Sequence, residues 1–214
     1  MSKNEGKQFE EDWKGSYSKT SYYYMRLRDG AKWVQSQASA FTPENPCDAI
    51  QHTMPFLWLL ELKTNGSGSI SFYPFTDDGG FPWKKPKGKA EKDIKTNQVK
   101  EIMDAVKTEG IIGGFVLNFR ERILKKSTHP PATYFVHISD FLTFARESGK
   151  ASINVEDCEK IGILISQKKK VKNYKYDIEN FVNEAVVTYI KRGHIDKSDL
   201  KNAYDWIGKL LSAV

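Results

Sequence analysis

The stretch Phe56-Leu-Trp-Leu-Leu-Glu-Leu-Lys63 is the most apolar in the chain. Pro55 precedes it and Asn65-Gly66-Ser67-Gly68 follows it, and both flanks are typical breaks of regular structure. The run is too short for a typical helix, so it predicts a buried central strand. Glu61 and Lys63 at its end require a partner or a task, because an unpaired buried charge is costly.

Apolar patterns on both sides of this strand predict an α/β fold. Residues 97–109 carry apolar side chains at helical spacing, and the run 111–119 predicts a second buried strand. Upstream, Phe9 and Trp13 at an i, i+4 spacing predict a first helix. A strand, a helix and a strand in this order favour at least one parallel pair in a central sheet. The remaining predicted elements are a strand over 22–27, a strand over 133–138 and a short helix over 140–146.

The last part of the chain differs from the rest, because it has the pattern of two amphipathic helices, over 179–190 and 198–211. Ser198 is a candidate cap for the second helix, since a serine side chain can accept a hydrogen bond from an N–H of the first turn. We therefore expect one domain over 1–178 and a C-terminal helical extension over 179–214 that packs on the core or across a dimer.

Length and composition set limits on the class of protein. The 214 residues suffice for one hydrophobic core and a small appendage. No run approaches the roughly 18 apolar residues of a membrane span. The first residues lack the apolar segment of a signal peptide, so a cytoplasmic protein without a membrane partner is expected. Cys47 and Cys158 have no partners at metal-binding spacing and are expected to be reduced thiols.

The charge is unevenly distributed. The formal net charge is +6 and the isoelectric point is about 9.1, which fits a polyanionic partner but does not identify one. Six lysines fall in residues 81–95 and five in residues 167–175. Each segment fits a solvated loop as well as a nucleic-acid contact, and the sequence leaves both open.

Asp48, Glu61 and Lys63 form the pattern Asp-x12-Glu-x-Lys, whose last two residues lie on the predicted central strand. Side chains two positions apart on a strand project from the same face. Glu61 and Lys63 should therefore point together, while Leu60 and Leu62 face the opposite side. Asp48 follows a proline turn and is separated from the central strand by an intervening strand, from which it can reach the same place.

Two carboxylates and an ammonium group make a coherent hydrolytic site. Carboxylate oxygens are ligands that Mg²⁺ prefers, and a bound metal polarises a phosphodiester oxygen and lowers the pKa of a water. Lys63 can orient that water or stabilise the negative charge that develops on phosphorus. The same pattern also fits a simple Glu61–Lys63 ion pair at a strand edge with Asp48 as a loop cap.

A wider set of residues resembles the RecU family of Holliday-junction resolvases, in the PD-(D/E)XK nuclease superfamily, and especially its phage and prophage members. The similarity follows the chain in order over roughly residues 6–178. It rests on Gly6-Lys-x-Phe-Glu10, Tyr24-Met-Arg-Leu-Arg-Asp29, Asp48, Leu59-Leu-Glu-Leu-Lys-Thr64, Ser69-Ile-Ser-Phe72, Gln98, Gly113-Gly-Phe-Val-Leu-Asn-Phe-Arg120, Lys150-Ala-Ser-Ile153 and Tyr174-Lys-Tyr-Asp-Ile178.

This resemblance implies a restriction-endonuclease-like core, with a mixed central sheet flanked by helices. It also implies a homodimer that cuts four-way DNA junctions symmetrically with Mg²⁺, for which Mn²⁺ substitutes. By position, Asp48 and Glu61 match the metal-binding carboxylates and Lys63 matches the catalytic lysine. Glu10 resembles an acidic residue on the first helix that supports the metal, and Gln98 resembles a glutamine near the active site, although Gln98 also fits an ordinary exposed helix position.

Further positions are candidates for DNA contacts. Arginine and lysine bind phosphates, and tryptophan can stack on bases. The candidates are Arg26, Arg28, Trp83, Lys84, Lys85 and Arg120. Trp58, by contrast, is expected in the core. One departure from the family is the short segment 30–47, where family members carry a stalk that enters the junction centre.

The sequence thus predicts a metal-dependent, structure-selective endodeoxyribonuclease. It would resolve Holliday junctions or other branched DNA by phosphodiester hydrolysis, in recombination or phage DNA processing. Two alternatives stay open. One is another PD-(D/E)XK nuclease that acts on linear DNA, and the other is a non-catalytic DNA-binding accessory protein of recombination.

Overall fold

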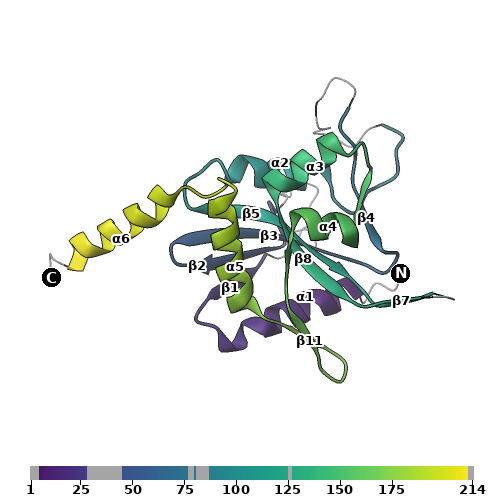
Figure 1. The fold of residues 1–214 in the computed structure, drawn as a ribbon, viewed down its shortest axis with the longest axis horizontal. Helices are drawn as coiled ribbons and strands as arrows, with labels where there is room; N and C mark the ends of the chain where they lie inside the picture. The colour runs from purple at the N-terminus through teal and green to yellow at the C-terminus, as the bar shows by residue number, and fades with distance from the viewer. Residues whose placement is uncertain (1–4, 28–44, 77–79, 81–86, 125–126, 212–214) are drawn as a thin grey trace, which may run out of the picture.

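The structure is a computed structural model that describes residues 5–27, 45–76, 80, 87–124 and 127–211, and only the backbone at 203 and 206–211. Its centre is a mixed six-stranded sheet in the order β1-β2-β3-β5-β8-β10 (Figure 1). The strands are β1 (Tyr23–Arg26), β2 (Ala49–Thr53), β3 (Phe56–Asn65), β5 (Ile111–Phe119), β8 (Ala132–His137) and β10 (Ile163–Leu164).

The pairing of these strands makes the sheet mixed. β1, β2 and β3 form an antiparallel meander, and β3 then pairs in parallel with β5 from Leu57–Ile111 to Asn65–Phe119. β8 is antiparallel to β5, and β10 is antiparallel to β8. A helix links β3 to β5, as a parallel pair requires. The prediction of an α/β fold with a mixed central sheet flanked by helices is confirmed.

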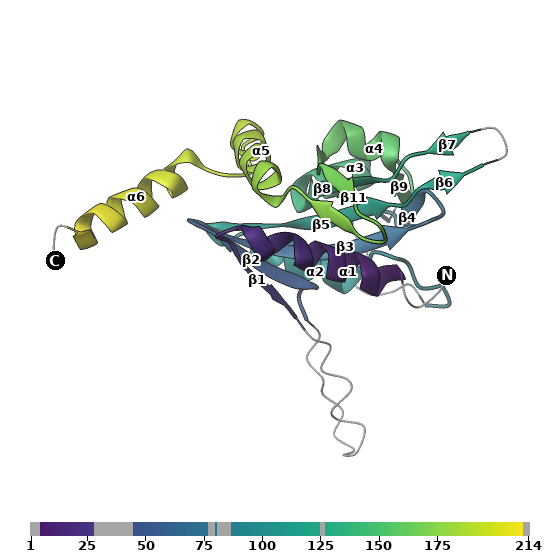
Figure 2. The ribbon, with the colours of Figure 1, turned by 90° about the horizontal axis from the view of Figure 1, so that it is seen from below.

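The described part of the chain contains six α-helices. They are α1 (Glu5–Ser16), α2 (Thr96–Ala105), α3 (Ile138–Glu147), α4 (Val155–Ile161), α5 (Ile178–Lys191) and α6 (Lys197–Leu211). Of these, α1 to α5 lie against the sheet (Figures 1 and 2). A short 3-10 turn, Tyr17–Lys19, continues α1. None of these helices combines the length and apolar character that crossing a bilayer requires.

Three small antiparallel pairs complete the described elements. They are β4 (Ser69–Ser71) with β9 (Ser152–Asn154), β6 (Arg122–Ile123) with β7 (Thr128–His129), and β11 (Gln167–Lys169) with β12 (Tyr174–Tyr176). The sequence pattern predicted none of them, because strands of two or three residues are too short to show alternation.

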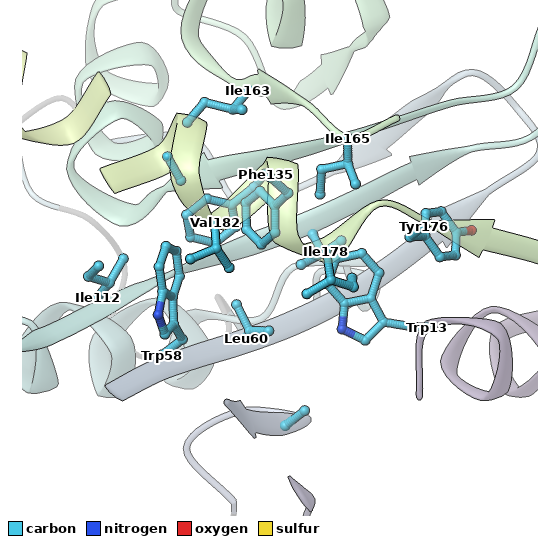
Figure 3. Packing of buried hydrophobic residues seen from close by; sticks show 14 of the residues in the cluster. Trp13, Trp58, Leu60, Ile112, Phe135, Ile163, Ile165, Tyr176, Ile178 and Val182 are labelled. Carbon is cyan, nitrogen blue, oxygen red and sulfur yellow. The ribbon is translucent and has the colours of Figure 1, made fainter. Parts of the chain in front are cut away.

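Alternate side chains of β3 project into one apolar layer on a single face of the sheet. Trp58 and Leu60 point into a cluster built with α1 and α5, which includes Trp13 and Phe181 (Figure 3). A second cluster on the other face lies under α2, α3 and α4, and Phe115 of β5 is among its members. Each fully buried large side chain contributes roughly 1.5–3 kcal/mol, so the first cluster holds β3 firmly in the sheet. The prediction that Trp58 belongs to the core is confirmed.

The C-terminal part begins with α5, whose side chains lie in the same apolar cluster as Trp58 and Leu60. The division of the chain at residue 178 stays a prediction. α6 leads away from the sheet (Figures 1 and 2). The prediction that Ser198 caps it is wrong, because α6 begins at Lys197 and the backbone N–H of Ser198 donates to Oδ1 of Asp196 at 2.8 Å. The aspartate therefore does the capping.

Two other predictions are refined. The helix expected over 97–109 ends at Ala105, and the chain then turns, with Thr108 donating to the carbonyl of Ala105 at 3.0 Å. Gly110 closes this turn with a φ of 78°, a conformation that glycine adopts without strain. Cys47 and Cys158 are buried free thiols, as expected.

Candidate active site

Asp48 is held beside β3 by the antiparallel register of the β2–β3 hairpin. Ala49 pairs with Leu60, so the residue before Ala49 lies next to Glu61. The carboxylate of Asp48 accepts a hydrogen bond from the backbone N–H of Leu62 through Oδ2 at 2.8 Å. The backbone carbonyl oxygen of Asp48 accepts a hydrogen bond from the backbone N–H of Leu27, also at 2.8 Å. Asp48 is thus fixed to two strands at once.

Glu61 and Lys63 project together from β3, as the alternation of a strand predicts. Nζ of Lys63 lies 2.7 Å from Oε1 of Glu61, while Leu60 and Leu62 belong to the apolar cluster on the opposite face. The Glu61 side chain is 1% exposed and the Lys63 side chain 18%. A buried carboxylate with a partly open ammonium beside it leaves the lysine as the side of the pair that solvent or substrate can reach.

Gln98 enters the site from α2. Its Nε2 donates to Oε1 of Glu61 at 2.5 Å, and its Oε1 accepts from the backbone N–H of Lys95 at 3.0 Å. The second bond caps the first turn of α2, so the amide is fixed at both ends. The structure therefore brings together four of the predicted catalytic residues: Asp48, Glu61, Lys63 and Gln98.

Two glycines allow α2 and β8 to approach β5 closely enough for this arrangement. A Cβ at Gly113 would lie 2.6 Å from Cγ2 of Ile102 on α2 and 2.8 Å from Cγ1 of Val106. A Cβ at Gly114 would overlap the carbonyl oxygen of Val136 on β8. The absence of a side chain at Gly113 thus allows α2 to lie close to the sheet, which places the Gln98 amide within hydrogen-bond distance of Glu61.

The electrostatics of the cluster follow from its burial. Burial raises the pKa of Glu61 to about 8, with Lys63 opposing the shift and Asp48, which also shares a hydrogen bond with Glu61, adding to it. Burial alone would lower the pKa of Lys63, but the carboxylates of Glu61 and Asp48 outweigh it and raise that pKa. With both carboxyls ionised, one negative charge remains unbalanced by the single ammonium.

This arrangement fits a divalent cation. Two carboxyl groups close enough to share a hydrogen bond repel each other when ionised, and a cation between them removes that repulsion. Their oxygens are ligands of the type that Mg²⁺ selects, and Mg²⁺ keeps several waters, so two protein carboxylates can suffice. Within the described ranges no group of three or more His, Cys, Asp or Glu side chains converges on one point.

Glu10, the third carboxylate predicted to support the metal, has another partner. It forms an ion pair with Arg26 of β1, one of the predicted DNA contacts. Arg120, another of these, forms an ion pair with Glu5, also on α1. Both arginines therefore join the sheet to α1.

The other candidates for DNA contacts lie outside the described residues. These are Arg28, Trp83, Lys84 and Lys85, and most of the segment compared with the family stalk lies outside them as well.

One charged residue near the site was missed by the sequence analysis. Asp93 acts on Lys63 electrostatically and helps to raise its pKa. It is fixed by Ser71, whose backbone N–H and hydroxyl both donate to Oδ2 of Asp93 at 2.8 Å. Asp93 follows a segment rich in Gly, Pro and Lys that has no periodicity, so no local signal marked it.

The chain is similar to a prophage protein in sequence and to a resolvase in structure. It is 30% identical over 195 residues to the SPbeta prophage-derived uncharacterized protein YotM of Bacillus subtilis strain 168, in an alignment that covers 86% of this chain and 87% of that protein. Among solved structures it is similar to Hjc, a Holliday junction resolvase of the archaeal hyperthermophile Archaeoglobus fulgidus, with a TM-score of 0.41 and 14% identity over 74% of this chain and 95% of that one. No protein-family model matches the chain.

Proposed function

We propose that this chain, which belongs to the same family as the Bacillus subtilis prophage protein YotM, is a metal-dependent endodeoxyribonuclease that cuts four-way or otherwise branched DNA. The observation that carries the proposal is the cluster of Asp48, Glu61 and Lys63 on the central sheet, with Gln98 bound to Glu61. A buried pair of carboxylates next to an ammonium group suits phosphodiester hydrolysis better than it suits a purely structural role. An ion pair at a strand edge would need neither the second carboxylate nor the glutamine.

Asp48 and Glu61 would hold Mg²⁺, with Mn²⁺ as a substitute, and the metal supplies a polarised phosphate oxygen and a water of lowered pKa. Lys63 lies on the accessible side of the cluster, where its ammonium orients the attacking water and stabilises negative charge on the phosphorus. Its raised pKa keeps it protonated at neutral pH. Gln98 fixes the orientation of the Glu61 carboxylate, and the N–H of Leu62 fixes that of Asp48.

The preference for branched DNA rests on the resemblance of residues 6–178 to the RecU family. A two-fold symmetric junction cut at paired positions requires two copies of the site, so a homodimer is part of the proposal. Lysine and arginine contacts to phosphate would supply most of the affinity, which should then fall steeply with salt.

The direct test uses a labelled four-way junction and a linear duplex of matching sequence, each with Mg²⁺, Mn²⁺ or EDTA. Lys63→Ala is compared with Lys191→Ala, an exposed lysine on α5. Paired nicks in the junction that need metal, disappear in Lys63→Ala and persist in Lys191→Ala would support the proposal. Faster cutting of the linear duplex would favour a different nuclease, and metal-independent binding without any cutting would favour a non-catalytic accessory protein.

A further inference from the structure

The β11–β12 hairpin presents a lysine face that the proposed active site does not use. Lys168 and Lys175 are direct partners across the two strands. Lys170 lies two positions beyond Lys168 and is exposed, and its backbone N–H donates to the carbonyl of Asn173 at 2.7 Å to close the turn. Because side chains two apart share a face, these three ammonium groups lie on one side of the hairpin.

The residues at the alternate positions of the hairpin face the protein. Gln167, Lys169, Tyr174 and Tyr176 point the other way: Tyr176 is in the apolar core, and the ammonium of Lys169 lies 3.6 Å from a carboxylate oxygen of Glu121. The charge of Lys169 on the inward face is therefore compensated by the protein itself.

The lysine face has no such compensation. Within the part of the chain that the structure describes, no carboxylate lies within ion-pair distance of Lys168, Lys170 or Lys175. Like charges directly opposite on two strands are destabilising. A pair such as Lys168 and Lys175 therefore weakens the free hairpin, and a bound polyanion would remove the repulsion.

The same three lysines line a hollow of about 380 Å³ beside the end of α1. Lys19 and the hydroxyl-bearing residues Ser16 and Thr20 line it from the α1 side. Two carboxylates, Asp177 and Glu179, also line it. Four lysines against two carboxylates leave the hollow positive.

Asp177 is further occupied as the cap of α5, where Oδ1 accepts from the backbone N–H of Asn180 at 3.2 Å. Ser16 is engaged as well, since its Oγ accepts from the backbone N–H of Tyr176. Thr20 donates to the carbonyl of Tyr17 and keeps lone pairs to accept bonds. The lysines are therefore the groups of the hollow that are available to a ligand.

The hairpin is held in a fixed position relative to the catalytic strand. A chain of side-chain hydrogen bonds crosses the sheet, from Thr64 of β3 to Asn118 at 2.8 Å, from Asn118 to Thr133 at 2.8 Å, and from Thr133 to Gln167 of β11 at 2.6 Å. Thr64 is the neighbour of Lys63. The spacing between the lysine face and the active site is thus built into the core.

Helix α1 fixes the hairpin from its other side. The backbone N–H of Tyr174 donates to Oδ2 of Asp12 at 2.8 Å, and that of Tyr176 donates to Oγ of Ser16 at 2.9 Å. Figures 1 and 2 both show the hairpin alongside α1. Glu10, two positions from Asp12, faces β1 instead through Arg26. The hairpin and the β1 side therefore lie on different flanks of α1.

We propose that this lysine face, Lys168, Lys170 and Lys175 with Lys19, is a second DNA-contact surface that binds the phosphates of a duplex arm away from the scissile bond. The inference rests on the proposed function and names how the enzyme holds a branched substrate: one arm lies at Asp48, Glu61 and Lys63, and another lies on the hairpin. The lysine ammonium binds phosphate as a point charge, and phosphate contacts do not distinguish one base from another. This surface therefore contributes affinity for an arm of any sequence.

The test compares a hairpin variant, Lys168→Ala/Lys170→Ala/Lys175→Ala, with a control of equal charge change, Lys191→Ala/Lys197→Ala/Lys201→Ala, on α5 and α6. Binding of a four-way junction is measured in EDTA over a series of salt concentrations. Each phosphate contact contributes about 0.9 to the slope of log affinity against log salt. We expect the slope of the hairpin variant to fall by about 2–3 and the affinity at 0.15 M salt to fall at least tenfold, an order-of-magnitude estimate.

A variant with arginine at the same three positions should keep the slope, because it keeps the charge. In cleavage assays the hairpin variant should show a raised KM with an unchanged kcat, since the lysine face is not in contact with the reacting phosphate. Equal slopes for the hairpin variant and the control would overturn the inference. So would a loss of binding to anionic lipid vesicles or to duplex RNA with unchanged binding to DNA.

This result is separable from that of the proposed function. Binding in EDTA does not depend on catalysis, so the hairpin effect can be present in a protein that cuts nothing. Conversely, normal junction cutting with an unaffected slope would leave the nuclease in place and remove only the second surface.

Discussion

Nε2 of Gln98 and Oε1 of Glu61 lie 2.5 Å apart although the two residues are 37 positions apart in the chain. The same oxygen of Glu61 pairs with Lys63, so one atom receives a neutral donor from a helix and a charged donor from its own strand. This shared acceptor fixes the geometry of the proposed site, and it can be tested separately from the charges.

Replacing Gln98 by alanine should slow cleavage by about tenfold or more, because groups that orient a metal ligand typically contribute 10–100-fold. It should also lower the free energy of unfolding by about 1 kcal/mol, since the amide caps α2. Gln98→Glu keeps the acceptor for the N–H of Lys95 but loses the donor to Glu61. Cleavage should therefore fall in both variants, and the cap should be lost only in the alanine variant. Glu101→Ala, an exposed change on α2, is the control; equal rates for it and Gln98→Ala would contradict the assignment.

Substitution of Asp48 should abolish metal binding, whereas substitution of Lys63 should slow cleavage and leave metal binding intact. A ligand at 100 times its Kd stabilises a protein by about 2.7 kcal/mol. We expect Mg²⁺ to raise the melting temperature of the wild type and of Lys63→Met, but not that of Asp48→Asn. Lys63→Met should nevertheless cut at least about a hundredfold more slowly. Calorimetry in Mg²⁺ and in EDTA gives the stabilisation, and the assignment fails if Asp48→Asn is stabilised as strongly as the wild type.

Acid should destabilise the protein through His137. This side chain is buried at the end of β8, where Nδ1 accepts from the backbone N–H of Ser139 at 3.2 Å. Burial lowers its pKa to about 3, with His194 and Arg192 acting in the same direction and Asp140 opposing them. An unfolded histidine has a pKa of about 6.5. Below that value the unfolded state takes up a proton that the folded state does not, so stability is present above pH 6.5 and is lost as pH falls towards 3.

The expected loss is on the order of 1.4 kcal/mol for each pH unit in that window. His137→Asn keeps an acceptor for the N–H of Ser139 and cannot take up a proton, so it should flatten the slope. His52→Asn, at an exposed position, should not. Urea unfolding at pH 7, 6, 5 and 4.5 checks this, above the range where Asp140 titrates. An unchanged slope in His137→Asn would assign the acid sensitivity to other groups.

Two glycine-to-alanine changes should act in opposite directions. At Gly114 a Cβ would overlap the backbone carbonyl of Val136, which cannot move without disturbing β8, so Gly114→Ala should lower stability by roughly 1–3 kcal/mol or more. At Gly15, in α1, nothing lies within 4 Å of the added methyl, and alanine should raise stability by about 0.5–1 kcal/mol. Thermal unfolding of the two variants side by side gives the sign of each change.

Much of the fold was predictable because long apolar runs leave few choices. β3 and β5 are central strands, and the apolar runs Phe56–Lys63 and 111–119 indicate their burial. The same alternation placed Glu61 beside Lys63 and away from Leu60. The predicted trio was recoverable because two of its members share a strand and the third lies one short hairpin away.

The remainder depends on contacts that no local pattern records. The β11–β12 hairpin consists of three-residue strands, and its lysines in the sequence resemble a solvated loop. Asp93 acts electrostatically on Lys63 from a position in which Ser71 binds its carboxylate. The ion pairs of Arg26 and Arg120 with α1 likewise join residues far apart in sequence, so those side chains could not be distinguished from free phosphate ligands beforehand.

The missing side chain at Gly113 has a consequence for how the activity could be tuned. Because a methyl group there would overlap Ile102 and Val106, we expect its addition to push α2 outward and to carry Gln98 with it. The size of the residue at position 113 should thus change the position of the Gln98 side chain, although the two residues are not in contact. A laboratory selection for weaker or stronger cutting should find compensating pairs between 113 and the size of residues 102 and 106, before it finds any change among the carboxylates themselves.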